Sequence, residues 1–229
     1  MPVIVFASPK GGAGKSTSAV VLATELARRG AEVVVIDADP NRPLSHWAKR
    51  PGKPDGLTVL PDVTEATIID EIEAAAARVP FVVVDLEGTA SMTVAYAISR
   101  ADLVIVPTQG SQLDAAEAAK AIRLIRQQEK AFGRRIPHAV LLTRTSAAIR
   151  PRTLQHIRGE LAQNGVPVLE TQMHEREAFR AIFSFGGSLE GLKASQVSGL
   201  PSAVKNAQAL VAEVIGLLRS AKTQPEAAA

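Results

Sequence analysis

The segment Lys10-Gly11-Gly12-Ala13-Gly14-Lys15-Ser16-Thr17 constrains the fold more than any other part of the sequence. It follows the apolar run Val3–Phe6 and leads into a stretch, from Gly14 to Arg29, with apolar residues at helical spacing. Small residues between a strand and a helix let consecutive backbone N–H groups surround phosphate oxygens, and the positive end of the helix adds to their attraction. The segment therefore predicts a phosphate-binding loop. The alternative is a glycine-rich turn with a surface lysine.

Short runs rich in Val and Ile alternate with helical stretches along the rest of the chain, which is typical of strand–helix–strand units feeding a parallel sheet. We expect strands at residues 3–6, 33–36, 57–60, 81–84, 103–106, 139–142 and 166–169. We expect helices at residues 14–29, 42–50, 64–78, 115–132, 153–164, 175–185 and 202–218. The pattern predicts a three-layer α/β/α P-loop NTPase with a mostly parallel central sheet, in one domain over residues 1–222. Residues 223–229 lack an apolar period and are expected to form a disordered tail.

Composition narrows the function. The 229 residues include no cysteine, which excludes a disulfide framework, a thiolate zinc site and a cysteine-ligated iron–sulfur cluster. No signal peptide and no run approaching the roughly 18 apolar residues of a membrane span is present, so we expect a soluble cytoplasmic protein. Charge is uneven, because residues 1–119 carry 10 basic and 15 acidic side chains, whereas residues 120–180 carry 12 and 5.

The loop and two strand ends supply the groups that Mg-ATP chemistry needs. Lys15 would neutralise the β- and γ-phosphates, the Ser16 hydroxyl would ligate Mg²⁺, and Thr17 would lie near the α-phosphate. Acidic side chains at the carboxyl ends of parallel strands face the crevice where ligands bind, and they occur here at Asp37, Asp39 and Asp85. The alternatives are an Asx turn made by Asp39 before Pro40 and a strand-end aspartate at position 85.

The form K-G-G-x-G-K-[ST] resembles the deviant Walker A box of the ParA/MinD family of ATPases. Asp37-Ala38-Asp39-Pro40 is similar to that family's switch motif, Asp85 stands where its Walker B acid belongs, and Pro107-Thr108 with Leu113-Asp114 matches a further loop. The short chain looks most similar to small plasmid-partition ParA proteins, and a border-binding conjugation relative is similarly close. Two features depart from the patterns: Pro9 replaces a glycine of the general P-loop, and Leu86-Glu87-Gly88-Thr89 replaces the family's Thr-Pro-Pro.

The resemblance implies ATP and Mg²⁺ as cofactors and gives roles to individual residues. Lys10 would reach across a two-fold dimer to the partner's ATP, because it lies too far back in the loop for its own γ-phosphate. The implied catalytic residues are Lys10, Lys15 and Asp39, the last positioning the attacking water. The implied metal site consists of Ser16, Asp37 and Asp85. The nucleotide would be bound by Lys10, Gly11, Gly12, Ala13, Gly14, Lys15, Ser16 and Thr17, with Arg144 and Met173 near adenine. A solvated Lys10 and a salt-bridged surface Arg144 are the alternatives.

Seven basic residues of the second half are candidates for non-specific duplex DNA contact: Arg150, Arg152, Arg158, Arg176, Arg180, Lys193 and Lys205. No aromatic residues are interleaved with them, which disfavours base readout and favours salt-sensitive phosphate contact. A solvated helix face is the alternative.

By resemblance, we expect a nucleoid-associated ATPase whose ATP-dependent dimerisation and DNA binding position a plasmid or other cargo, stimulated by a ParB-like adaptor. Three alternatives stay open: a conjugation-complex accessory ATPase, a MinD-like membrane-associated ATPase, and a metabolic P-loop enzyme. The ending Leu217-Leu218-Arg219-Ser220-Ala221-Lys222 with its acidic tail is a poor membrane anchor.

Overall fold

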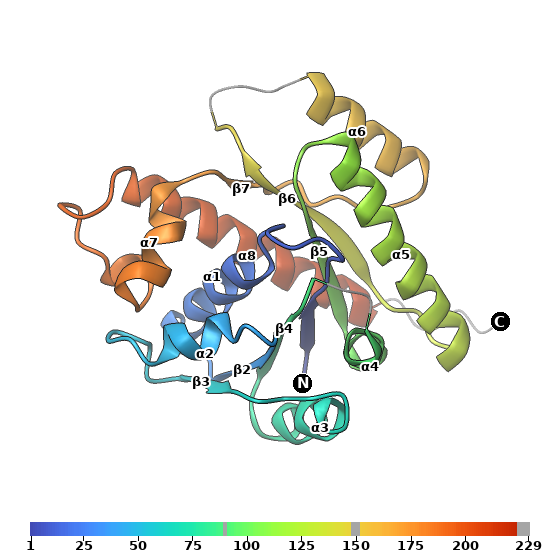
Figure 1. Ribbon diagram of the computed structural model, residues 1–229, viewed down its shortest axis with the longest axis horizontal. Helices are drawn as coiled ribbons and strands as arrows, with labels where there is room; N and C mark the ends of the chain where they lie inside the picture. Colours follow the sequence, from blue (N-terminus) through green and yellow to red (C-terminus); the bar gives the residue numbers. More distant parts are fainter. Residues whose placement is uncertain (89–90, 148–151, 224–229) are drawn as a thin grey trace.

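The computed structural model describes residues 1–88, 91–147 and 152–223, which form a central sheet between two layers of helices (Figure 1). Seven strands follow the order β3-β2-β4-β1-β5-β6-β7, and every described pair is parallel. The strands are β1 (Val3–Phe6), β2 (Val33–Ala38), β3 (Leu57–Leu60), β4 (Phe81–Leu86), β5 (Leu103–Thr108), β6 (His138–Thr145) and β7 (Met173–His174). The sheet thus confirms the expected α/β class and is parallel throughout its described part.

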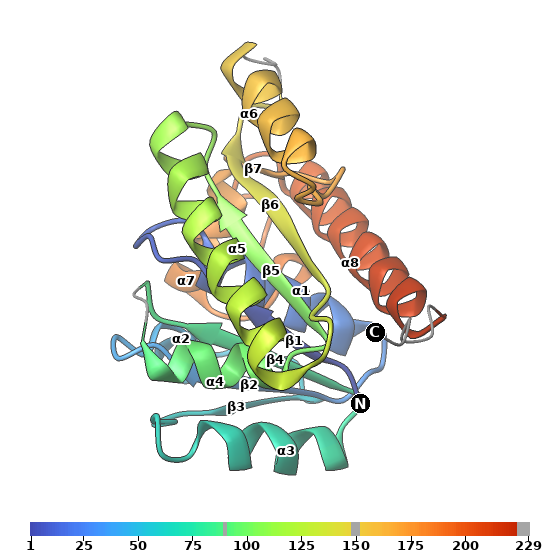
Figure 2. The same cartoon turned by 90° about the vertical axis from the view of Figure 1, so that its right-hand side faces the viewer.

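Both faces of the sheet are covered by helices, as Figure 2 shows from the side. The helices are α1 (Lys15–Arg28), α2 (Pro43–Ala48), α3 (Ile68–Arg78), α4 (Met92–Arg100), α5 (Gln112–Phe132), α6 (Arg152–Gln163), α7 (Glu177–Phe185) and α8 (Leu200–Thr223), with a 3₁₀ turn η1 (Leu189–Gly191). Helices α1, α2, α7 and α8 pack on one face. Helices α3 to α6 pack on the other. Each layer therefore buries its own apolar core.

The side chains of β1 point alternately to the two faces of the sheet, which explains why this strand is apolar throughout. Ile4 and Phe6 join the core beneath α1, whereas Val3 and Val5 join the core beneath α3 to α6. Successive strand side chains point to opposite faces, and both faces are covered here, so every position must be apolar. Strand β1 lies between β4 and β5, where the strand order reverses, so the loop after it opens at the ligand-binding point of such sheets.

Several predicted elements need correction. The strand expected at residues 166–169 is wrong, because only Val168 forms an isolated bridge to Val140, and the edge strand β7 begins later, at Met173. Pro167 has no N–H to donate, so a regular ladder cannot form there. Helix α4 was not expected; Ser91 caps it by accepting a hydrogen bond from the Val94 backbone N–H. Helix α8 continues to Thr223, and the rest of the predicted tail, 224–229, lies outside the described residues.

Helix α2 is joined to the end of α7, far away in sequence. The indole Nε1 of the buried Trp47 donates to the Gly187 carbonyl at 3.1 Å. Arg50 Nη1 donates to the Ser184 carbonyl at 2.9 Å. The short helix after β2 is therefore held at its carboxyl end by the α7–η1 turn.

The tight packing of this turn gives a stability prediction. A Cβ at Gly186, whose φ is +85°, would lie 2.5 Å from Arg50 Cβ and 2.6 Å from the Pro51 carbonyl oxygen. Gly30 has nearly the same φ, +86°, with no atom within 4 Å of its added Cβ. Gly30→Ala should therefore cost about 1 kcal/mol of unfolding free energy, from backbone conformation alone, and Gly186→Ala on the order of 3 kcal/mol or more. Urea unfolding measures both, and equal losses would contradict the packing.

Candidate nucleotide site

The loop between β1 and α1 has the backbone of a phosphate cradle. Gly12 and Gly14 adopt φ of +75° and +99°, values that side-chain-bearing residues rarely take. Gly14 is the N-cap of α1 and provides no side-chain hydrogen bond, so the first N–H groups of the helix are not satisfied by a side-chain cap. These groups open into a cavity of about 420 Å³, lined from the loop by Gly11, Gly12, Gly14, Lys15, Ser16 and Thr17. The structure thus brings the predicted phosphate residues together, apart from Lys10 and Ala13.

The divergent segment after β4 forms part of this cavity. A Cβ at Gly88 would lie 2.9 Å from the Gly11 nitrogen and 3.1 Å from the Lys10 carbonyl carbon. Only glycine fits this contact without displacing the phosphate loop, which explains one residue of the unusual Leu86-Glu87-Gly88 sequence. Glu87 lines the cavity as well. Thr89 lies outside the described residues.

Lys15 is a buried cation among acidic groups. Only 6% of the residue is exposed, and its amine donates to the Lys10 carbonyl at 3.4 Å. Burial lowers the pKa of the Lys15 amine from its usual value, while Asp85, Asp39 and Glu87 oppose that shift. The amine is therefore held at the floor of the cavity, where it can offset phosphate charge.

Asp37 and Asp85 are in-register neighbours on β2 and β4, and both are buried. Ser45 donates its backbone N–H and its hydroxyl to Asp37 Oδ2, at 2.7 and 2.6 Å. Asp37 Oδ1 and both carboxylate oxygens of Asp85 have no hydrogen-bond partner among the described residues. Burial raises the pKa of the Asp85 carboxyl to about 7 and also raises that of Asp37.

These unpartnered oxygens fit a divalent cation. Carboxylate and hydroxyl oxygens are the ligands that Mg²⁺ prefers, and proteins usually bind it through one or two carboxylates together with substrate phosphates. The described residues contain no cluster of three or more His, Cys, Asp or Glu side chains that could hold a metal without a phosphate. Ser16, Asp37 and Asp85 therefore suit a cation shared with a nucleotide.

Asp39 lines the same cavity as the loop, together with Pro40 and Asn41. Its Oδ1 accepts hydrogen bonds from the Asn41 backbone N–H at 2.8 Å and from the Asn41 side-chain amide at 3.0 Å. The Asx turn considered from the sequence is thus present, and it leaves this carboxylate facing the phosphate cavity.

Lys10 points away from the cavity that its own loop forms. Its amine lies 2.5 Å from Asp114 Oδ1, near the start of α5, and it does not line the phosphate cavity. The buried Asp114 carboxylate also accepts a short hydrogen bond from Ser111. Although burial acts in the opposite direction, these hydrogen bonds hold the pKa of Asp114 below its usual value. The second lysine of the loop therefore has an acidic partner in the same chain.

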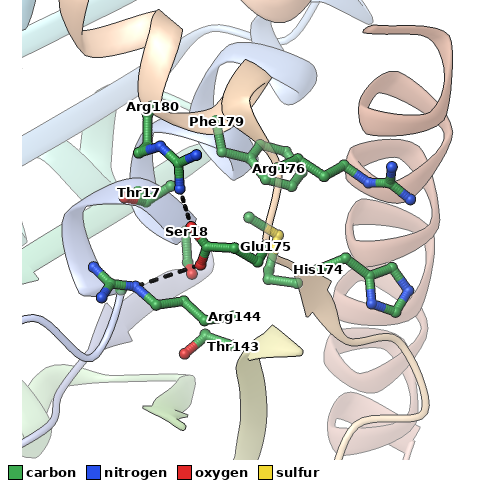
Figure 3. A pocket seen from close by; sticks show the side chains of 11 residues that line it. Thr17, Ser18, Thr143, Arg144, His174, Glu175, Arg176, Phe179 and Arg180 are labelled. Carbon is green, nitrogen blue, oxygen red and sulfur yellow. Dashed lines mark hydrogen bonds and ion pairs between the residues drawn. The ribbon is translucent and has the colours of Figure 1, made fainter. Parts of the chain in front are cut away.

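A second cavity, of about 160 Å³, adjoins the loop and α1 (Figure 3). Met173 and Phe179 give it apolar walls. Arg144 lines both cavities. Its backbone has a φ of +51° and lies at the register shift between Thr143 and Thr145 in the pairing of β6 with β7. Its Nε lies 3.9 Å from Glu175 Oε2. The backbone irregularity thus turns Arg144 towards the space beside the loop.

Ser18 and Phe179 also line this cavity, and the sequence did not indicate either of them for the base. Ser18, on the first turn of α1, is buried, and its hydroxyl has no hydrogen-bond partner among the described residues. Glu175 pairs with both Arg144 and Arg180. Phe179 comes from α7. Only the position of Ser18, directly after the loop motif, could have indicated its place.

The basic residues proposed for DNA do not form one cluster. Arg158 pairs with Glu170 at 2.8 Å, Arg180 pairs with Glu175, and Arg176 lines the second cavity with Arg180. Arg152, on α6, and Lys205, on α8, are exposed on helices that cover opposite faces of the sheet. Lys193 is exposed in the loop after η1. Arg150 lies outside the described residues.

Comparisons with known proteins agree with this geometry. A model of the VirC1 protein family matches residues 1–221. The ParA protein of Rhizobium radiobacter is 45% identical over 221 residues, covering 96% of this chain and 99% of the relative. The ATP complex of a McdA variant from Cyanothece has a TM-score of 0.70 at 15% identity, covering 100% and 99% of the two chains. Cobyrinic acid a,c-diamide synthase from Mycobacterium smegmatis, with ADP and magnesium, has a TM-score of 0.62 at 18% identity, covering 80% and 93%. The two structures show the fold.

The buried charge of Asp85 gives a prediction on pH and stability. Its folded pKa, about 7, is above the usual 3.8, so the stability contributed by the neutral carboxyl is present at acidic pH and is lost as pH rises towards 7. Without nucleotide and Mg²⁺, Asp85→Asn should therefore raise the melting temperature at pH 8 and have a smaller effect at pH 4.

A thermal melt over this pH range tests the prediction, with the exposed Asp55→Asn as control. Asp55→Asn, at an exposed position, should leave the melting temperature close to that of wild type. Adding Mg-ATP should stabilise wild type and fail to stabilise Asp85→Asn. A lower melting temperature of Asp85→Asn at pH 8 would contradict the prediction, because it would mean that other groups of the chain offset the charge of this carboxylate.

Proposed function

The chain belongs to the VirC1 protein family and is a ParA/MinD-type deviant Walker A ATPase, and from this premise we propose that its ATP cycle switches it between a monomer and a DNA-bound dimer. Family membership makes it a ParA-like partition or positioning ATPase. The finer assignments rest on the charges and contacts of the site.

ATP would be held by the loop amides, with Lys15 against the β- and γ-phosphates and Thr17 near the α-phosphate. Ser16 and Asp85 would hold Mg²⁺, which neutralises charge on the β- and γ-phosphates, and Asp37 would support the metal site from its bond to Ser45. The adenine would occupy the cavity between Met173 and Arg144. These roles account for the unpartnered carboxylate oxygens and for the buried amine beside them.

Asp39 would orient the attacking water. It lines the phosphate cavity together with Lys15 and Ser16, so its carboxylate borders the space where the attacking water would bind. Both hydrogen bonds from Asn41 end on Oδ1, so the other carboxylate oxygen, Oδ2, would accept from that water.

The single observation that carries the switch is the position of Lys10. Its amine is held by Asp114 outside the phosphate cavity, so it offsets no charge on the nucleotide of its own chain. In a two-fold dimer that joins the two loops, the amine would leave Asp114 for the partner's triphosphate. ATP would then stabilise the dimer through a contact that the monomer lacks, and hydrolysis would remove it.

Duplex DNA is the proposed partner of the dimer. Arg152, Lys193 and Lys205 are exposed cations for which the described residues show no acidic partner, and such side chains suit phosphate contact. Arg158 and Arg180 would first have to leave Glu170 and Glu175. A ParB-like adaptor would stimulate hydrolysis. No described helix is long and apolar enough to cross a membrane.

Light scattering and sedimentation with and without Mg-ATP, then with duplex DNA at low and high salt, test the proposal. We expect ATP to double the mass and DNA binding to require ATP and to weaken steeply with salt. A metabolic P-loop enzyme would turn over ATP only with a small acceptor and would show no DNA-linked signal.

Lys10 and its acidic partner give opposite predictions. Lys10→Ala should bind ATP with near-normal affinity and fail to dimerise, because the contact across the dimer is lost. Asp114→Asn should dimerise at lower ATP concentration, because the amine no longer has to leave a carboxylate. Lys15→Ala, which should lose ATP binding, is the control. Stable ATP-dependent dimers of Lys10→Ala would show that Lys10 does not bridge the two chains.

A further inference from the structure

Two strained residues of different loops are joined to each other. Among the described residues, only three other than glycine have φ in the left-handed region: Arg42 at +50°, Asp62 at +62° and Arg144 at +51°. Arg42 Nη2 and Asp62 Oδ1 form an ion pair at 2.5 Å. Two unfavourable backbone conformations therefore meet in one contact. Backbone strain of this kind occurs most often at functional sites.

The ion pair joins the Asp39 loop to the edge of the sheet. Arg42 is the N-cap of α2, and its backbone N–H donates to the Asp39 carbonyl at 2.8 Å. Asp62 follows β3, the edge strand that pairs with β2. The ion pair thus joins the turn that contains Asp39, directly after β2, to the loop that follows the neighbouring strand β3.

The pair alone does not hold the loop in this conformation. Its side chains are 54% and 58% exposed, so solvent screens their attraction, and an exposed ion pair contributes less than two left-handed residues cost. The remaining stability comes from buried contacts of α2, the bonds of Ser45 to Asp37 and of Trp47 to Gly187. The loop is therefore held on one side by buried contacts and on the other by a contact that opens easily.

We infer that Arg42 and Asp62 form a latch that positions Asp39 for hydrolysis. The inference rests on the water-orienting role proposed for Asp39. Arg42 and Asp62 are positioning residues, since neither lines the phosphate cavity. With the latch closed, the turn at residues 39–42 keeps the Asp39 carboxylate on the cavity wall. With the latch open, Arg42 can leave the left-handed conformation and carry the turn away from that wall.

The test compares steady-state hydrolysis by Arg42→Ala, Asp62→Ala and the double variant. Each should lower kcat by about tenfold and leave KM for ATP within about twofold, because the catalytic group is misplaced while the phosphate loop is untouched. The double variant should be no slower than either single one, since all three break the same contact. The exchange Arg42→Asp with Asp62→Arg should recover part of the rate.

Two controls separate positioning from stability. Glu73→Ala breaks an ion pair to Arg100 on the opposite face, with a carboxylate 59% exposed, and should keep the wild-type rate. Arg42→Gly suits the positive φ and removes the strain, so it should match or exceed wild type in urea unfolding while hydrolysing as slowly as Arg42→Ala. A wild-type kcat in Arg42→Gly or in Asp62→Ala would overturn the latch.

The sole tryptophan, Trp47, lies on α2 and gives a readout that needs no hydrolysis. Its emission should change between wild type and Arg42→Gly in the absence of nucleotide, and stay unchanged in Glu73→Ala. If Asp39→Ala hydrolyses at the wild-type rate, the proposed role of Asp39 fails. If Asp39→Ala is inactive and the latch variants are as active as wild type, only the latch fails.

Discussion

The buried carboxylates of Asp37 and Asp85 are the constraint on which the site depends. They are adjacent in register, and three of their four oxygens lack a partner among the described residues. Removing charged groups from water without compensation is costly, and Lys15 alone does not offset them, as the raised pKa of Asp85 indicates. In the proposed function, a divalent cation carried by a polyphosphate would supply the missing charge.

Asp37 also connects this end of the sheet to helix α2. Asp37 holds α2 through Ser45, and Trp47 holds the other side of α2 against the α7–η1 turn. Helix α7 in turn begins directly after the loop that closes the second cavity. The two cavities and the Asp39 loop are therefore joined by contiguous hydrogen bonds and packing.

The sequence predicted the parts whose chemistry is local. The phosphate loop and the strand-end acids are patterns of neighbouring residues, and the parallel sheet follows from apolar strands covered on both faces. It could not predict the pairing of Lys10 with Asp114, or the contact of Gly88 with Gly11, because these depend on which loops meet at the sheet edge. The edge strand was misplaced because β7 has two residues, too few for a periodic signal.

Mixing two inactive variants tests most directly whether the triphosphate of one chain is completed by Lys10 of its twin. Lys10→Ala keeps its own Lys15 and Asp39, and an Asp39→Ala partner can still supply Lys10, so an equimolar mixture contains one complete site in each mixed dimer. We predict that hydrolysis by the mixture exceeds the summed rates of the two variants measured separately. A mixture that shows only that sum, with mixed dimers present by sedimentation, would contradict the account.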